Sequence, residues 1–389
     1  MQRFGYGLGS LALSSLLRAE SSGTRFDLSP KISPQKPRAK SVILLMQNGG
    51  PSPMDLFDPK PALNRLAGKT YTGKVEPFQT GNSDKLLGNP FAFAKYGACG
   101  MDFAEVLPEM AALADRFTMV RSMKSEHNNH TEALLLFSTG KIFQGRPSLG
   151  SWISYGLGSE NDSLPAFVVL RDPAGYNTSG TLLWKNGWLP ALFRGTEIST
   201  QGAPIPNLVP KTIRPSSIES RSLGLLAKLN EKHRDRYPDE SALDARIRNY
   251  ELAARMQLAA SDVLDWKSET SATQKLYGLE GDTTRSYGLR CLMARRLVES
   301  GVRFVHVCPP KGQPWDAHND VDGQNRTVCA QTDRGSAALT RDLEDRGLLD
   351  DTIVIWAGEF GRNPVSQNGK GRDHNRLAFT LLLAGGGFR

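Results

Sequence analysis

The sequence predicts an α/β fold in which a doubly wound, mostly parallel sheet carries helices on both faces. Short apolar runs open into glycine-rich turns, as SVILLMQ (residues 41–47) does before NGGPSP. Segments with helical periodicity, such as residues 286–301, alternate with these runs. Strands without a polar face are typical of parallel sheets, because helices cover both sides of such sheets.

Six short apolar segments bounded by turn residues are predicted as strands. They are residues 41–47, 118–123, 165–171, 302–310, 352–359 and 377–387. Five segments between them repeat apolar residues at helical spacing and are predicted as helices. They are residues 103–117, 129–139, 240–266, 286–301 and 332–351.

The chain of 389 residues is long enough for one large domain or two smaller ones. We predict a single domain over residues 41–389. The stretch from 172 to 216 is rich in Gly, Pro and Asn and has little periodicity. It therefore predicts an insertion around residues 172–240, over one end of the sheet.

The first 40 residues have a different composition. Residues 4–20, FGYGLGSLALSSLLRAE, resemble the apolar part of an export signal and are too short to span a bilayer. Residues 1–20 are therefore predicted as a signal-like segment and residues 21–40 as a linker, which implies a periplasmic or extracellular protein without a transmembrane span. Arg3 is the only charge before the apolar run, so either the true start lies upstream or the signal is weak. A buried or amphipathic helix is the alternative.

The charge of the chain indicates no nucleic-acid partner. The net charge is +8 and the pI about 9.3, but the basic residues are scattered. They predict a weak preference for anionic partners. The four cysteines form no CxxC pair, which argues against a cysteine–zinc site.

Polar residues gather after the predicted strands, where functional loops of doubly wound sheets lie. Four of the six histidines stand there beside carboxylates or amides, while His233 is predicted to be solvated and His306 to be a core residue. Imidazoles and carboxylates on one edge suit zinc, manganese or calcium. The candidate ligands are Asn48, Asp55, His127, Asp316, His318, Glu359, Asp373 and His374.

Each of these residues also has an ordinary structural explanation. The aspartates of DLFDPKP can set an Asx turn, and short motifs such as DHN often cap helices. It is their joint position at strand ends that favours a site. Two ions there could clamp a phosphate or sulfate ester, with Arg121, Arg362 and Arg372 available for its oxygens.

The motifs around these residues resemble one bacterial family, domain of unknown function 1501. They are NGGPSPMDLFDPKP, NHTEALLLFSTGK, PWDAHN, DDTIVIWAGEFGR and GRDHN followed by LAGGG, and the match covers nearly all of the chain from residue 41. This resemblance implies an alkaline phosphatase-like fold, grouping with the alkaline phosphatases and sulfatases, a sulfatase-like label, and leaders of the twin-arginine type.

The resemblance also implies roles for individual residues. Asn48 stands where alkaline phosphatases carry a ligand aspartate, and Glu359 and Phe360 stand where they carry Asp-His. His130 falls at the place of the nucleophile, where it could ligate metal or form a phosphohistidine-type intermediate, and the adjacent Thr131 could attack with one register shift. The catalytic candidates are therefore His130, Thr131 and Arg362. Asp316, His318, Asp373 and His374 remain as ligands.

Two departures limit the parallel. The replaced ligands argue against ordinary two-metal phosphatase chemistry, and the chain has no C/S-x-P-x-R motif, which argues against a formylglycine sulfatase. The chain stops at LLLAGGGFR, just after a predicted strand, so the resemblance leads us to expect a C-terminally truncated version.

Two functional hypotheses follow. The first is an exported metal-dependent hydrolase of phosphate or sulfate esters, whose substrate is an anionic small molecule or polysaccharide. The second is a non-catalytic descendant of the fold that binds a metal or a glycan. The first requires His130, Asp316, His318, Glu359 and His374 to converge.

Overall fold

The computed structural model describes residues 28–31, 36–201, 216–237 and 241–388. The predicted export segment and much of the predicted linker lie outside these ranges. None of the helices within them is long and apolar enough to cross a bilayer.

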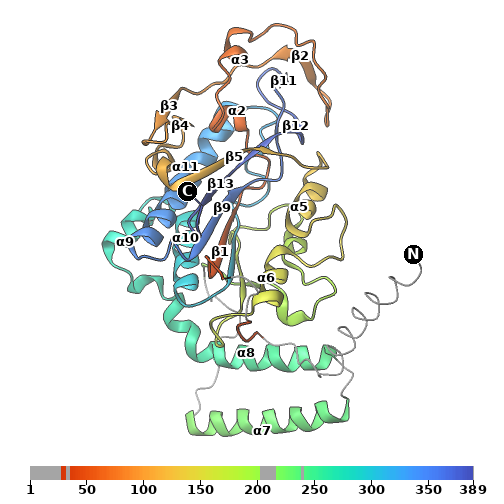
Figure 1. The fold of residues 1–389 in the computed structure, drawn as a ribbon, viewed down its shortest axis with the longest axis vertical. Coiled ribbons are helices and arrows are strands. Elements are labelled where there is room, and N and C mark those ends of the chain that lie inside the picture. Colours follow the sequence, from red (N-terminus) through yellow and green to blue (C-terminus); the bar gives the residue numbers. More distant parts are fainter. Residues whose placement is uncertain (1–27, 32–35, 202–215, 238–240, 389) are drawn as a thin grey trace, which may run out of the picture.

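A seven-stranded sheet forms the centre of the molecule, in the order β5-β13-β9-β1-β8-β6-β7 (Figure 1). Its strands are β1 Ser41–Met46, β5 Phe117–Met123, β6 Phe167–Leu170, β7 Thr196–Glu197, β8 Phe304–Val307, β9 Thr352–Ala357 and β13 Phe379–Ala384. All six predicted strands are present. β13 runs antiparallel to both of its neighbours, and the other six strands share one direction. The predicted α/β fold with a mostly parallel sheet is confirmed.

The buried strands have apolar side chains on both faces. In β1, Ile43 and Leu45 pack into the larger core cluster, while Leu44 and Met46 pack into a second cluster on the opposite face. This alternation follows from the two-residue period of a strand. It explains why the run SVILLM has no polar positions in its middle.

Helices cover both faces of the sheet, as predicted (Figure 1). On one face lie α10 (Asp282–Glu299) and α11 (Val321–Asp345), and on the other lie α5 (His130–Thr139) and α6 (Leu149–Leu157). The helices α8 (Ser241–Leu264) and α7 (Ser216–Arg236) extend at one end of the molecule.

Shorter elements surround this frame. The remaining helices are α2 Pro53–Leu56, α3 Pro61–Arg65, α4 Pro108–Ala111 and α9 Ser271–Leu276, and the 3-10 turns are Ala114–Arg116, Gly180–Trp184, Ala191–Phe193 and Trp266–Ser268. The small strands are β2 Asn82–Leu86, β3 Phe93–Tyr96, β4 Met101–Ala104, β10 Gly361–Arg362, β11 Val365–Gln367 and β12 His374–Asn375.

One local prediction was wrong, and one strand was not predicted. The single helix expected over residues 103–117 is a strand end, a four-residue helix and a 3-10 turn, because β4 pairs with β3 and Pro108 starts α4. The segment expected as an insertion contributes β7, which pairs with β6 and adds an edge strand to the sheet. Two residues are too few to give a periodic signal. The prediction of one domain over residues 41–389 stays a prediction.

The direction of the strands determines which loops meet. The ends of β1, β5, β8 and β9 lie on one edge, since these strands run the same way. β13 runs in the opposite direction, so the residues that precede it, including β12, reach the same edge. Polar residues from sequence positions near 48, 130, 316, 359 and 374 therefore gather at one place.

Candidate metal centre

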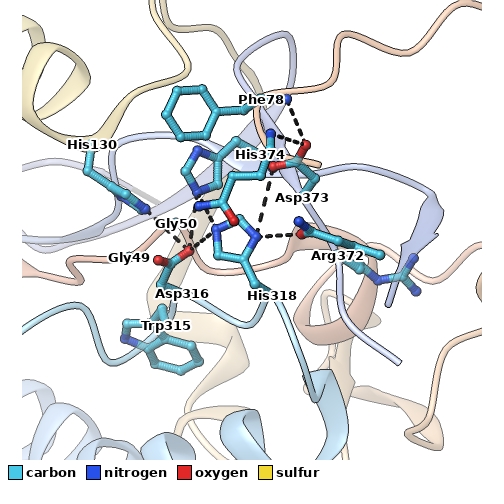
Figure 2. A network of polar contacts seen from close by, with 12 residues as sticks. Gly49, Gly50, Phe78, His130, Trp315, Asp316, His318, Arg372, Asp373 and His374 are labelled. Carbon is cyan, nitrogen blue, oxygen red and sulfur yellow. Dashed lines mark hydrogen bonds and ion pairs between the residues drawn. The ribbon is translucent and has the colours of Figure 1, made fainter. Parts of the chain in front are cut away.

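Four side chains from three loops converge at this edge. His130, Asp316, His318 and His374 each offer one ligand atom, and these atoms all lie within 4.8 Å of one another. Asp316 Oδ1 is at their centre, 3.2 Å from His130 Nε2, 2.9 Å from His318 Nε2 and 3.2 Å from His374 Nε2 (Figure 2). We call these four residues the metal cluster.

The far nitrogen of each histidine ring is held by an acceptor. His130 Nδ1 lies 2.6 Å from Glu359 Oε1, and His374 Nδ1 lies 2.6 Å from the carbonyl oxygen of Asn128. His318 Nδ1 lies 2.5 Å from Gln367 Oε1. The Gln367 amide nitrogen donates to the Thr80 carbonyl, which turns its oxygen toward His318. Since carboxylate and carbonyl oxygens only accept, all three rings donate from Nδ1.

A neutral imidazole that donates from Nδ1 carries a lone pair on Nε2. The three Nε2 atoms and Asp316 Oδ1 are then four acceptors that face one another. His318 Nε2 and His374 Nε2 are only 2.9 Å apart, and His130 Nε2 is buried without a hydrogen-bond partner. Acceptors at such distances repel unless a positive charge lies between them. The cluster is therefore short of a cation.

Arg362 supplies part of the missing charge. Its Nη2 lies 2.6 Å from Asp316 Oδ1, and the guanidinium also donates to the carbonyl groups of Gly49, Gly50 and Arg372. The side chain is fully buried. With its nitrogens engaged in this way, Arg362 positions Asp316 and the loop after β1.

Charges around the cluster shift the proton affinity of its members. Burial alone would raise the pKa of Asp316, but its close contacts with the three histidine rings and the charge of Arg362 hold that pKa far below its ordinary value. Burial alone would lower the pKa of His130, but its contacts with Asp316 and Glu359 raise it above the ordinary value. Burial lowers the pKa of His374. A proton on His130 Nε2 is thus the alternative to a metal ion at that nitrogen.

The donor set fits a divalent transition metal. Three imidazole nitrogens and one carboxylate oxygen match the ligands of zinc, whereas calcium takes six to eight oxygens. Ligands about 2.0–2.1 Å from one ion lie roughly 3 Å apart on neighbouring positions, which is the spacing around Asp316 Oδ1. Nδ1 held by a carboxylate, an amide or a carbonyl is the usual support of ligating histidines.

The loops that carry the metal cluster are positioned by close packing of their backbones. Gly49 has φ +113°, and a Cβ there would lie 2.7 Å from the backbone nitrogen of Asp316. The N–H groups of Gly49 and Gly50 both donate to Glu359. A Cβ on Gly371 would overlap the carbonyl of His318. Glycine at these positions lets three loops approach one another.

α5 brings His130 to the cluster. The side chain of Asn129 accepts from the Thr131 N–H and caps the helix, so His130 is its first residue. The C-terminal end is closed by Gly140 in the left-handed region, with φ 75°. The histidine that was expected in the place of a nucleophile lies here among the potential ligands, with both ring nitrogens facing carboxylates.

Other predicted site residues lie around the cluster or apart from it. Glu359 contacts the cluster through His130, and Asp373 lies behind His318, accepting from the backbone of Phe78 and Gln79. Asn48 is fully buried, and neither of its side-chain polar atoms has a partner.

Three further candidates have contacts elsewhere. Asp55 pairs with Arg372, both fully buried, and is not part of the cluster. His127 is partly exposed and lies 4.0 Å from Glu132. Thr131 is the second residue of α5, and its role as a nucleophile stays a prediction.

Several supporting residues were not predicted. Gln367 stands in an ordinary turn sequence, and the Asn128 carbonyl is a backbone group, so neither carries a signal in the sequence. The ring of Phe78 stacks on His374 at 4.6 Å, and Phe360 lies 4.8 Å from the His130 ring. These aromatic rings pack against two of the three histidines of the cluster.

Comparison with solved structures finds loose likenesses. A mutant of the TAB5 alkaline phosphatase with Mg bound in its M3 site has 10% identity and a TM-score of 0.36, and the alkaline phosphatase from the Antarctic bacterium TAB5 has 9% and 0.34. In both cases 90% of this chain and 92% of that chain are covered.

The lipoteichoic acid synthase LtaP from Listeria monocytogenes has 10% identity and a TM-score of 0.33, over 95% of this chain and 72% of that chain. Likenesses at these TM-scores assign this chain no activity. No curated protein matches the chain by sequence.

One protein family does match. The family described as "Protein of unknown function (DUF1501)" matches residues 39–389. The matched range covers most of the chain and contains the whole metal cluster, in agreement with the resemblance seen in the motifs. The chain belongs to the DUF1501 family.

Proposed function

We propose that the protein is an exported, metal-dependent hydrolase of phosphate or sulfate esters, with zinc as its metal. The observation that carries the proposal is the convergence of three Nε2 atoms and one carboxylate oxygen, all acceptors, in a buried place. His130, Asp316, His318 and His374 would hold the ion. A bound divalent ion would supply a Lewis acid for the oxygens of an ester.

The chain's own residues have distinct parts in this proposal. Glu359, Gln367 and the Asn128 carbonyl hold the rings so that every Nε2 faces inward. The first turn of α5 lies at the cluster, and the positive end of a helix favours an anion. Thr131, in this turn, is the proposed nucleophile, because both ring nitrogens of His130 are engaged.

Export rests on residues 1–20, whose sequence resembles a signal segment and which lie outside the described residues. The proposed location is periplasmic or extracellular. Zinc is preferred to manganese or calcium because imidazole nitrogens outnumber oxygens in the cluster.

A specific observation favours a second candidate, a non-catalytic metal-binding protein. Of the three arginines expected to bind the ester oxygens, Arg362 and Arg372 are fully buried and bonded within the protein. The third, Arg121, pairs with Asp58 and Asp102. A catalytic centre needs another group for those oxygens, whereas a binding protein does not.

Elemental analysis of the full chain is the first test, on the wild type and on His130→Ala, His318→Ala and His127→Ala. We expect stoichiometric metal in the wild type and in His127→Ala, since His127 lies outside the cluster, and loss of metal in the other two. Hydrolysis of aryl phosphates and aryl sulfates is then measured on the same preparations. Metal without any hydrolysis would favour the second candidate, and a folded protein that binds no metal would contradict both.

A further inference from the structure

A separate cleft of about 510 Å³ lies at the other end of α5. Leu135 and Thr139 of α5 line it, together with the loop at 144–146 and residues between 182 and 188. A helix rises about 1.5 Å per residue, so Thr139 lies roughly 14 Å along the axis from His130. The cleft is therefore distinct from the metal cluster but is joined to it by one rigid helix.

Exposed tryptophans mark this region. Trp188, which lines the cleft, is 58% exposed, and Trp152 beside it is 42% exposed. Their ring centroids are 6.0 Å apart with an interplanar angle of 74°. Large aromatic rings exposed next to each other are typical of a surface that binds a ligand. The faces of these rings are suited to the C–H surface of a sugar ring.

The charge around the cleft is positive. Arg146 lies over the Trp188 ring, with its guanidinium carbon 5.5 Å from the centroid, and Lys185 also lines the cleft. In the described part of the chain neither cation has an ion-pair partner. The sequence has no acidic residue from 133 to 159 or from 173 to 196, the two stretches that supply the lining. An anion entering the cleft therefore meets no carboxylate from these stretches.

We propose that this cleft binds an anionic oligosaccharide, whose sugar rings carry sulfate, phosphate or carboxylate groups. Trp188 packs against a sugar ring, Arg146 and Lys185 pair with the anionic groups, and the Gln144 amide bonds to hydroxyls. A saccharide bound in this cleft would present its ester to the metal cluster. This consequence rests on the proposed function. The binding itself needs no metal.

The shape of the cleft favours a saccharide over a nucleic acid. Single-stranded nucleic acids bind in grooves where a row of cations follows the backbone. Here two cations stand beside one exposed ring in a lining of ten residues. Arg146 and Lys185 are the basic residues of this lining, and two cations do not make such a row.

Calorimetric titration of the full chain in the presence of a chelator tests the proposal. The probes are a heparin-type octasaccharide, a neutral maltooctaose and an eight-nucleotide single-stranded DNA. We expect the sulfated octasaccharide to bind and the other two to bind at least about tenfold more weakly. Equal binding of the DNA would overturn the saccharide assignment.

Variants locate the binding. Trp188→Ala and Lys185→Ala are expected to weaken octasaccharide binding about tenfold each, while Trp188→Phe retains most of it because a ring remains. Lys74→Ala and Tyr250→Ala are the matched controls, since both residues are exposed and lie outside the cleft. The substituted side chains are exposed, so the variants should fold. Affinities that stay unchanged in the cleft variants would refute the proposal.

The outcomes separate this inference from the proposed function. If octasaccharide binding persists in metal-free His318→Ala, the proposal that the cleft binds a saccharide is supported, whatever the hydrolysis assays show. Metal and ester hydrolysis in a protein that does not bind the octasaccharide would leave the proposed function intact and overturn only the cleft.

Discussion

Two polar clusters in this molecule, each with a buried centre, differ in how their charges are balanced. The first, which we call the arginine cluster, joins α10 and α11 and consists of Glu269, Arg295, Arg296, Glu299, Asp342 and Arg346. Its three guanidinium groups face three carboxylates. Arg295 alone contacts Asp342 at 2.9 Å, Glu269 at 2.6 Å and Glu299 at 2.5 Å.

The metal cluster lacks this balance. Asp316 and Glu359 bring two carboxylates, which both contact His130, and Arg362 pairs with Asp316 alone. Three imidazoles add lone pairs and no fixed charge. A buried network whose donors and acceptors match holds a fold together without help, whereas one with surplus acceptors needs something from outside. The difference distinguishes a structural network from a binding site.

The largest expected effect is the loss of the ligand at the centre of the metal cluster. Asp316→Asn removes the only anionic ligand, so we expect the metal to be lost and the proposed ester hydrolysis to fall about a thousandfold, which corresponds to about 4 kcal/mol. Elemental analysis and kcat/KM for an aryl ester measure both. If this variant kept the metal content of the wild type, the claim that only the metal cluster needs a cation would be contradicted.

Breaking the arginine cluster should have the opposite signature. Arg295→Met leaves Asp342 and Glu269 buried with fewer partners, so we expect a loss of about 3–5 kcal/mol in the free energy of unfolding, with metal content per folded chain unchanged. Urea unfolding measures the loss. Arg326→Met is the control, because its ion pairs are exposed and should contribute less than about 1 kcal/mol. A loss of metal in Arg295→Met would show that the clusters are coupled.

A histidine outside both clusters should control acid stability. Burial lowers the pKa of His306 to about 4, and its Nε2 has no partner. Because the folded pKa lies below the unfolded one, the neutral ring's contribution is complete above about pH 6.5 and is lost as the pH falls toward 4. At pH 4.5 this loss is about 2–3 kcal/mol.

His306→Leu tests this assignment, since it removes the titrating group without removing a hydrogen bond from Nε2. We expect its free energy of unfolding to fall less than that of the wild type between pH 7 and pH 4.5. Urea unfolding at the two pH values makes the comparison. An equal fall in the free energy of unfolding in the variant and the wild type would mean that other groups cause the loss of stability in acid.

The smallest effect concerns the support of a single ring. Glu359→Gln leaves an oxygen for His130 but removes the charge, so we expect metal affinity to weaken about 10–100-fold while the ion still binds at saturation. Competition with a chromophoric chelator measures the affinity. Glu344→Gln is a suitable control because Glu344 belongs to an exposed pair with Arg116 and lies outside both clusters. No change in affinity would show that Glu359 acts only on the backbone of Gly49 and Gly50.

Most strands of the central sheet and most helices against it could be predicted because each is indicated by its own local sequence pattern. The strands β1, β8 and β9 show as continuous apolar runs, and α10 ends near Gly301, a stop signal. The failures also have physical reasons. Residues 103–117 have helical periodicity, but pairing between β3 and β4 overrides it, and β7 is too short to show.

The sequence by itself determined the kind of chemistry that this edge can hold. Histidines and carboxylates followed apolar runs of strand length, and strand direction in an α/β sheet puts such loops on one edge. That was enough to single out His130, Asp316, His318 and His374, although it also included Asp55 and His127, which lie elsewhere.

Only the tertiary structure decided which of these residues meet and which nitrogen of each ring faces inward. His130 and His374 are separated by most of the chain, and they come together because β13 lies antiparallel between β5 and β9. The rings are oriented by Glu359, Gln367 and the Asn128 carbonyl, two of which have no sequence signal. Contacts between distant segments depend on the order of the strands in the sheet and on how closely backbone segments pack. Neither property can be predicted from the local pattern of residues.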